Sequence, residues 1–254
     1  MRNAIANNKF SLRYQIQVDS SKKKLLGLET LLRWHDDELG SISPSEFIPI
    51  AETNGLIQTI GEWVLRQSFL DYNQIISQTN HKDLILSVNV SVIQLENSNF
   101  LNMLKKVLAE TEMNSKNLLI EITETALMRN PKYTLNVISQ IMKLGIQFAL
   151  DDFGVSYSSM QYLKNLPVSL IKIDQGFISD MLTNSNDAKI VNAIIQLSHG
   201  MNIHTLAEGV ENHEQFQLLK QMGCEYMQGY YFAKPMPLID LLNEPMLTST
   251  NLNI

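Results

Sequence analysis

The sequence predicts an α/β protein, and a closed β/α barrel fits it better than an open sheet. Short apolar segments alternate with amphipathic stretches from one end of the 254 residues to the other, an alternation typical of parallel β/α architecture. Eight such apolar segments in a chain of this length match the size of an eight-stranded barrel, although the pattern alone does not prove closure. No linker rich in Pro, Gly or Ser divides the chain, so we expect one domain over residues 1–254.

The predicted strands are short apolar runs bounded by polar or glycine-containing segments. They lie near residues 11–18, 25–33, 84–90, 118–123, 146–151, 169–174, 203–208 and 226–232.

Helices are predicted between these strands from their own start and stop signals. One begins at Pro131 and ends before Gly145, because proline suits the first helical turn and glycine suits the position past the last. Two more are expected over residues 187–200 and 212–223. The stretch 44–80 is longer than one crossover needs and predicts an additional helix pair.

Composition excludes several classes of function. The formal net charge is −6, and no basic cluster follows the lysines at 22–24, so non-specific binding to duplex nucleic acid is not expected. The single cysteine, Cys224, rules out an intramolecular disulfide and a cysteine-rich zinc site. The histidines lack the spacing of metal ligands, and we interpret them as structural or surface residues: His35, His81, His199, His204 and His213.

The chain carries no signal for export or for membrane insertion. The first ten residues lack the apolar core of a signal peptide, and no run approaches the roughly 18 apolar residues that span a bilayer. We therefore expect a cytoplasmic protein without direct membrane insertion. If the protein is membrane-anchored, the anchor lies outside this chain.

Polar residues fall on one face of several predicted strands, near their C-terminal ends. Because side chains alternate along a strand, these residues share the face that looks into the barrel. Together with Asp152 and Glu208, which lie at the same rim, they offer six hard oxygen ligands at neighbouring positions: Glu29, Asn89, Glu121, Asp151, Asp152 and Glu208. Lys172 alternates with Asp174 in the same way. Each residue alone would be interpreted as a helix cap or a surface residue. Buried together, their charges must be balanced by other charges, water or metal ions. The set of oxygen ligands suits Mg²⁺ or Mn²⁺ rather than zinc.

The same residues resemble a known family. The segment GLETLLRW at 27–34 resembles the signature of the EAL-domain phosphodiesterases, which cut cyclic di-GMP to linear pGpG; the Glu-Ala-Leu of that name reads Glu29-Thr30-Leu31. Further motifs of the family follow in order over almost the whole chain: YQ at 14–15, PSEFIPIAETNGL at 44–56, VNVS at 88–91, EITE at 121–124, DDFG at 151–154, KID at 172–174, AEGVE at 207–211 and QGY at 228–230.

This resemblance implies a modified TIM (β/α)8 barrel whose first strand is antiparallel to the others. It also implies two ions, Mg²⁺ or Mn²⁺. The first would be held by Glu29, Asn89, Glu121 and Asp151, and the second by Asp151, Asp152 and Glu208. Two metals about 3.5–4 Å apart activate a bridging water and neutralise a phosphodiester. Ca²⁺, which takes more ligands at longer distances, is expected to inhibit.

The resemblance further implies three catalytic roles. Lys172 resembles the lysine that contacts the attacking water, Glu208 takes part in general-base chemistry, and Glu124 resembles the glutamate that tethers the loop after the strand at 146–151. Six positions look like contacts to the substrate: Gln15, Leu31, Arg33, Asp174, Glu211 and Gln228. Among them, Arg33 suits bidentate hydrogen bonds to a phosphate.

Three positions depart from the family pattern. Thr30 stands for Ala, Ile16 follows Gln15 where Pro is usual, and Ser156 takes the place of the second Gly in the loop after Asp-Asp-Phe-Gly. Thr30 points outward by parity and should affect packing more than chemistry. A serine at a position needing a positive φ would cost about 1 kcal/mol, so we expect Ser156 to bias the loop.

Alternative functions remain open at this point. A non-catalytic receptor for cyclic di-GMP or a protein-interaction module is the main alternative, but degenerate members of the family usually lose metal ligands and this chain keeps them all. An unrelated metal-dependent barrel enzyme is the other. The resemblance also suggests sensory or GGDEF domains before this domain, which would make the chain one piece of a longer protein. Because family members often dimerise, it suggests a homodimer as well.

Overall fold

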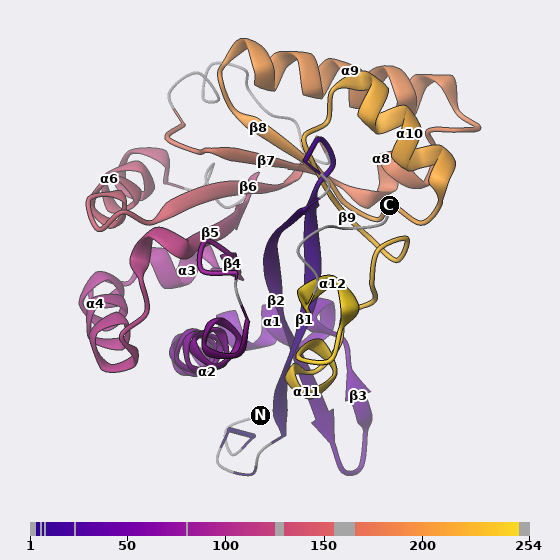
Figure 1. Cartoon of the computed structure of the whole chain (residues 1–254). Coiled ribbons are helices and arrows are strands. Elements are labelled where there is room, and N and C mark those ends of the chain that lie inside the picture. Colours follow the sequence, from indigo (N-terminus) through magenta and orange to yellow (C-terminus); the bar gives the residue numbers. More distant parts are fainter. Residues whose placement is uncertain are drawn as a thin grey trace.

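The computed structural model describes residues 4–5, 7, 9–22, 24–79, 81–124, 130–154 and 166–248. Eight strands close into a barrel with helices outside it (Figure 1). The barrel strands are β1 (Phe10–Asp19), β2 (Lys24–Asp36), β4 (Ile85–Asn89), β5 (Leu118–Thr123), β6 (Gln147–Phe153), β7 (Leu170–Ile173), β8 (His204–Ala207) and β9 (Tyr226–Gln228). A ninth strand, β3 (Gly40–Ile42), extends the sheet beyond β2.

The order around the barrel is β1-β9-β8-β7-β6-β5-β4-β2, and pairing of β1 with β2 closes it. Neighbours from β2 to β9 are parallel, whereas β1 is antiparallel to both β2 and β9. The four residues at 20–23 that separate β1 from β2 are too few for a parallel crossover, so the pair must form a hairpin. The expected modified (β/α)8 barrel with an antiparallel first strand is therefore confirmed.

Two of the predicted strands end three or more residues away from the observed ends, and the others agree within two residues. β2 continues past residue 33 because Trp34 pairs with Ile42 of β3, a strand that the sequence pattern did not predict. β9 ends at Gln228 rather than near 232, because the chain turns at Gly229. There a Cβ would lie only 2.1 Å from the carbonyl oxygen of Val210, so the turn requires glycine.

The predicted additional helix pair is α1 (Pro44–Thr53) and α2 (Ile57–Gln78). The other helices are α3 (Val92–Leu95), α4 (Phe100–Thr111), the 3₁₀ turn η1 (Ser115–Asn117), α6 (Pro131–Met142), α8 (Gln175–Asp180), α9 (Ser185–Gly200), α10 (His213–Met222), α11 (Leu238–Leu241) and α12 (Pro245–Thr248). In Figure 1, α2, α4 and α6 lie along one side of the strands, and α8, α9 and α10 along another.

Two separate apolar clusters fill the molecule. The larger one lies between the barrel and its helices and includes the outward residues of the strands, such as Leu28, Val88 and Ile120. The smaller one lies inside the barrel and consists of Leu119, Ala149, Leu170 and Leu206. Each residue of this inner plug lies two positions before a polar site candidate, so the next inward layer of the barrel is polar.

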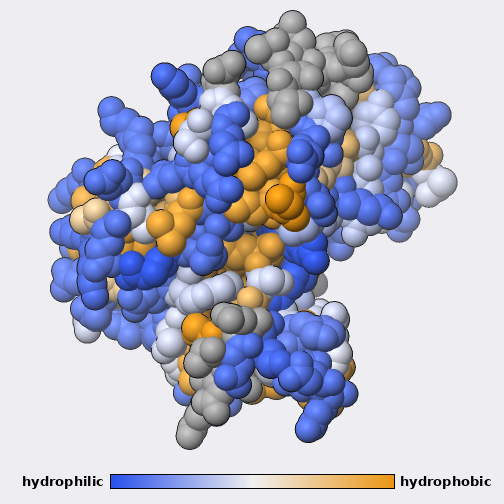
Figure 2. Space-filling model, turned by 60° about the horizontal axis from the view of Figure 1, so that its bottom comes forward, coloured by the Kyte–Doolittle hydropathy of each residue, from blue (hydrophilic) through white to orange (hydrophobic). Residues whose placement is uncertain are grey.

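The surface is mostly hydrophilic. On the face drawn in Figure 2, hydrophilic residues cover most of the area, and hydrophobic ones gather in its central part. Within the described ranges, no helix combines the length and apolar character that crossing a membrane requires.

Candidate active site

The candidate site begins one layer above the inner plug. Glu121 follows Leu119 by two residues on β5, Asp151 follows Ala149 on β6, and Lys172 follows Leu170 on β7. Glu208, just after β8, follows Leu206 in the same way. Because side chains alternate along a strand, these four residues form one polar layer next to the inner plug.

Lys172 is the centre of this layer. Its Nζ lies 2.8 Å from Oε2 of Glu121 and 2.9 Å from Oε1 of Glu208. It lies 3.1 Å from Oδ1 of Asp151 and 3.5 Å from Oε1 of Glu29. The lysine side chain is fully buried, and one positive charge faces four carboxylates. Charges this deep need compensation, so the cluster must bind protons or further cations.

The carboxyl groups of the cluster respond differently to this environment. Burial, reinforced by the charges of Asp151 and Glu29 and opposed by Lys172, raises the pKa of Glu208 to about 8. Burial also raises the pKa of Glu121 well above its ordinary value, again against the charge of Lys172. The pKa of Glu29 is lowered, because Lys172 and two amide hydrogen bonds outweigh the effect of burial. Without a metal ion, Glu121 and Glu208 therefore hold a proton more strongly than an ordinary glutamate, whereas Glu29 holds one less strongly.

Oxygen atoms converge where the second metal is expected. Asp151, Asp152 and Glu208 each offer a carboxylate oxygen, all within 4.8 Å of one another, and no other such group of three occurs in the described part of the chain. Oε1 of Glu121 is buried and has no hydrogen-bond partner among the described residues. An all-oxygen donor set with an unsatisfied carboxylate oxygen fits Mg²⁺ or Mn²⁺.

The backbone at Asp152 is unusual. Its φ is +54°, in the left-handed region that a residue with a Cβ rarely adopts. Such conformations persist where the surrounding structure holds them, and they are frequent at functional sites. Its amide nitrogen donates to Oδ1 of Asp151 at 3.1 Å, and burial together with that neighbouring charge raises the pKa of the Asp152 carboxyl.

The residues expected at the first metal also lie together. Asn89 pairs in register with Glu121 on the neighbouring strand, and its Nδ2 donates to Oε1 of Glu29 at 3.0 Å. Glu29, Glu121 and Asp151 all contact Lys172. The structure thus brings all six predicted ligands and the predicted lysine to one end of the barrel.

The six predicted substrate contacts divide into two sets. Leu31 and Arg33 line a cavity of about 720 Å³ that also reaches Glu121, Asp151 and Asp152. Its far wall comes from α1, α2 and α3 and is mostly apolar, with Ser45, Glu52 and Gln94 as polar residues. Burial and the charge of nearby Arg13 lower the pKa of the Arg33 guanidinium.

The other four predicted contacts do not line this cavity. Gln15 and Gln228 are buried and hydrogen-bond to each other, with Nε2 of Gln228 donating to Oε1 of Gln15 at 3.0 Å. Asp174 caps α8 by accepting from the amide of Gly176 at 2.9 Å. Glu211 is exposed.

Glu124 and the three departures from the family pattern are placed as follows. Oε2 of Glu124 accepts from the amide of Gly154 at 3.4 Å, so it links the end of β5 to the segment after β6. Ser156 lies outside the described residues. Ile16 is fully buried in the core, and the buried hydroxyl of Thr30 makes no hydrogen bond within the described part of the chain.

Sequence reasoning assigned no role to two buried polar residues inside the barrel, Gln17 and Ser87. Both are fully buried, and Oγ of Ser87 donates to Oε1 of Gln17 at 3.4 Å. A signal was present, because Gln17 follows Gln15 by two residues and therefore shares its inward face.

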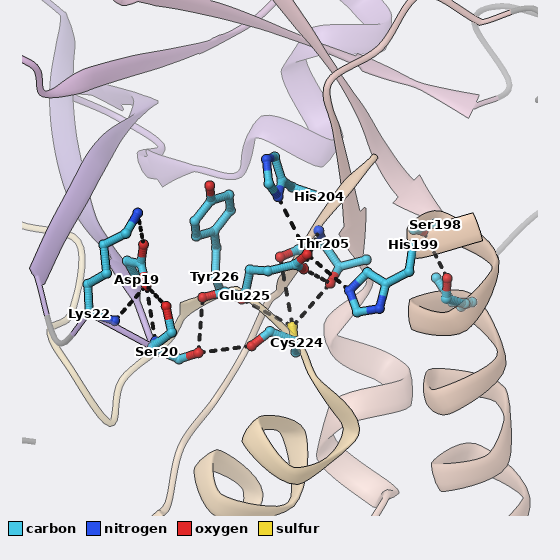
Figure 3. Close-up of polar contacts among 12 residues, drawn as sticks. Asp19, Ser20, Lys22, Ser198, His199, His204, Thr205, Cys224, Glu225 and Tyr226 are labelled. Atoms are coloured by element: carbon cyan, nitrogen blue, oxygen red, sulfur yellow. Dashed lines mark hydrogen bonds and ion pairs between the residues drawn. The ribbon is translucent and has the colours of Figure 1, made fainter. Parts of the chain in front are cut away.

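His199 and His204 lie near the start of β8, at the end of that strand opposite Glu208 (Figure 3). His199 and His204 both face Oε1 of Glu225, at 3.0 and 3.4 Å, and Thr205 donates to the other oxygen of that carboxylate. Burial raises the pKa of the neighbouring Cys224 thiol to about 12, which makes it a poor nucleophile.

Comparison with known proteins identifies relatives over nearly the whole chain. The family model of the EAL domain matches residues 1–235. The bifunctional diguanylate cyclase/cyclic di-GMP phosphodiesterase MucR of Pseudomonas aeruginosa is 36% identical over 95% of this chain, which corresponds to 35% of MucR. The oxygen sensor protein DosP of Escherichia coli is 35% identical over 93% of this chain and 30% of DosP. The chain therefore spans about a third of the length of the curated relatives it matches.

Solved structures show the same likeness. A structure described as the PaMucR phosphodiesterase in complex with c-di-GMP superposes with a TM-score of 0.90 at 36% identity. The match covers 94% of this chain and 97% of that one. The similarity in fold therefore extends over almost all of both chains.

Proposed function

Because this chain belongs to the EAL domain family, we propose that it is a metal-dependent phosphodiesterase that hydrolyses cyclic di-GMP to linear pGpG. The observation that carries the proposal is the layer of carboxylates around Lys172, which opens into a cavity lined by Arg33. At about 720 Å³ that cavity has the size of a small-molecule site.

The metal ligands in this proposal are the six residues expected from the sequence. Glu29, Asn89, Glu121 and Asp151 hold one ion, and Asp151, Asp152 and Glu208 hold the other. When bound, Mg²⁺ or Mn²⁺ supplies an activated water and neutralises phosphate charge. Oε1 of Glu121, which has no hydrogen-bond partner among the described residues, and the three converging carboxylates support this assignment.

The protein residues have separate tasks in the proposed reaction. The oxygen of the attacking water bonds to phosphorus, the P–O3′ bond breaks, and the 3′ oxygen leaves as a hydroxyl by taking a proton from a solvent water. Lys172 orients the attacking water. Glu208, which lies 2.9 Å from Lys172, accepts a proton from that water. Glu124 holds the segment after β6 through Gly154.

Substrate binding is assigned to the rim. Arg33 gives paired hydrogen bonds to a phosphate, and Leu31 contributes apolar contact from the same strand. The remaining assigned contacts are Gln15, Asp174, Glu211 and Gln228. Gln15 and Gln228 are buried in this structure and do not line the cavity, so their contact with substrate stays a prediction.

One incubation tests the proposal. The purified chain is mixed with cyclic di-GMP and Mg²⁺ or Mn²⁺, and the products are separated by chromatography, with Glu121→Gln as the matched inactive variant. We expect pGpG from the wild type alone. Binding without turnover would select the receptor, and absence of binding would favour an unrelated metal-dependent enzyme.

We also propose that this domain is part of a longer protein with further domains. Relatives such as MucR are longer than this chain by about a factor of three, which supports a domain that works beside sensory or GGDEF domains. A homodimer and a location in the cytoplasm stay predictions. Light scattering of the purified chain tests the first, and fractionation of cells expressing the full protein tests the second.

A further inference from the structure

A chain of buried amides leads away from the metal ligand Glu29. Nε2 of Gln228 donates to Oε2 of Glu29 and, at 3.0 Å, to Oε1 of Gln15. Oε1 of Gln228 accepts in turn from Nε2 of Gln17 at 2.9 Å. Behind it, Oε1 of Gln17 accepts from the hydroxyl of Ser87. The side chains come from β1, β2, β4 and β9, which are neighbours around the barrel.

The direction of every hydrogen bond in this chain follows from its end. An ionised carboxylate only accepts hydrogen bonds, so Gln228 must turn its NH₂ group toward Glu29. Its carbonyl then faces Gln17, which must donate. If the amide of Gln228 turned over, its oxygen would face the carboxylate of Glu29, and two acceptors would meet in a buried site.

Gln17 is placed to prevent that reversal. It is fully buried, pairs directly with Gln228 across β1 and β9, and does not line the cavity. On its other side it pairs with Gly27 of β2, where a Cβ would lie 3.2 Å from Oε1 of Gln17. A side chain at residue 27 would press on the carbonyl oxygen of Ile85 and on the amide of Gln17, so glycine leaves the room that this amide occupies.

We propose that Gln17 is a positioning residue for the metal site: it holds the amide of Gln228 in the orientation that fixes the carboxylate of Glu29. The inference rests on the proposed function in taking Glu29 as a metal ligand. Partners that orient a ligand typically change metal affinity about 10–100-fold when removed. Gln17 acts one hydrogen bond further away, so its effect is smaller.

The test measures Mn²⁺ affinity of the substrate-free protein by calorimetry in Gln17→Met, Gln228→Met and the double variant. Methionine keeps the length of glutamine but removes the hydrogen bonds. We expect affinity to fall roughly 10–100-fold in Gln228→Met and about three- to ten-fold in Gln17→Met. The double variant should be no weaker than Gln228→Met, because Gln17 acts only through Gln228.

The matched control is Asn117→Leu, which removes another buried amide. Nδ2 of Asn117 donates to the carbonyl of Leu84 at the opposite end of the strands. We expect this variant to lower the melting temperature without changing Mn²⁺ affinity. If Gln17→Met does not fold, Gln17→Asn replaces it, since one methylene less withdraws the donor from Gln228 and should weaken Mn²⁺ binding in the same way.

Three results would overturn the proposal: unchanged Mn²⁺ affinity in the folded Gln17 variant, additive effects in the double variant, or an equal loss of affinity in Asn117→Leu. Hydrolysis of cyclic di-GMP by the wild type is measured in parallel. A wild type that binds Mn²⁺ without cutting would refute the proposed activity alone, because the affinity comparison needs no substrate.

Discussion

At the scale of single residues, the site depends on one buried cation. Lys172 balances part of the charge of four carboxylates. The sequence predicted that these residues share a face, because the two-residue period of strands is readable from the order of polar and apolar residues. It could not predict that the lysine lies at their centre, because that depends on the register between strands that are far apart in sequence.

Replacing Lys172 by methionine should reduce both activity and stability. The change leaves buried carboxylates without their common partner, a loss of about 3–5 kcal/mol when such a pair is broken. Mg²⁺ should restore more stability in this variant than in the wild type. Thermal unfolding with and without Mg²⁺ measures this. The control is Lys22→Met, because Lys22 is exposed and pairs with a single carboxylate, that of Asp19. Equal stability of the two variants without metal would contradict the prediction.

Cys224 should react only slowly with thiol reagents in the folded protein. Its side chain is buried and its thiol pKa is raised to about 12, so the reactive thiolate is scarce at neutral pH. We expect a disulfide reagent at pH 8 to modify the native chain far more slowly than the chain in denaturant. Rapid stoichiometric labelling of the native protein, followed by absorbance, would show that the thiol is accessible.

At the scale of elements, the strand prediction succeeded where burial is continuous and failed where structure depends on a partner. β3 has only three residues and pairs with the extension of β2 that reaches Asp36. A segment of three residues is too short to show the alternation of polar and apolar residues that predicts a strand. Helix ends were readable, since Pro131 begins α6 and Gly223, with φ +91°, ends α10. The antiparallel direction of β1 was not readable from apolar periodicity, which is the same for either direction.

Glu225 should stabilise the end of the barrel where β8 and β9 begin, and this contribution should depend on pH. It links β8, α9 and β9 by accepting from Thr205 and facing His199. Burial would raise its pKa, but the hydrogen bonds from Thr205 outweigh that effect and lower the pKa below its ordinary value. A lowered carboxyl pKa contributes stability above the unfolded-state pKa, and this contribution is lost as pH falls through the folded-state value.

Glu225→Gln should therefore be less stable than the wild type by about 1 kcal/mol at pH 7, a value reduced for the partial exposure of this group. The difference should shrink as the pH falls below about 4.5. Urea unfolding of both proteins from pH 7 to pH 3 measures it. A difference that stays constant over this range would show that Glu225 acts through packing rather than charge.

At the scale of the whole molecule, the proposed metal site exists only while the barrel is folded, so metal binding should stabilise the folded chain. The proposed ligands come from β2, β4, β5, β6 and the end of β8, so unfolding of the barrel disperses them. An ion that binds only the folded state then stabilises the entire chain, by about 2.7 kcal/mol at a concentration one hundred times its dissociation constant. Binding and turnover can therefore be measured separately on the same protein.

Ca²⁺ should bind this protein without supporting hydrolysis. It takes six to eight oxygen ligands at about 2.3–2.6 Å, whereas Mg²⁺ demands near-octahedral geometry at about 2.0–2.1 Å, so Ca²⁺ should occupy the carboxylates without placing the water correctly. We expect Ca²⁺ to raise the melting temperature and to inhibit the Mg²⁺-dependent reaction competitively. Glu121→Gln, which exchanges a buried carboxylate for an amide of the same shape, should show a much smaller rise with either ion. Full turnover with Ca²⁺ alone would contradict the metal geometry proposed for this site, and an equal rise in Glu121→Gln would mean that the ions bind elsewhere.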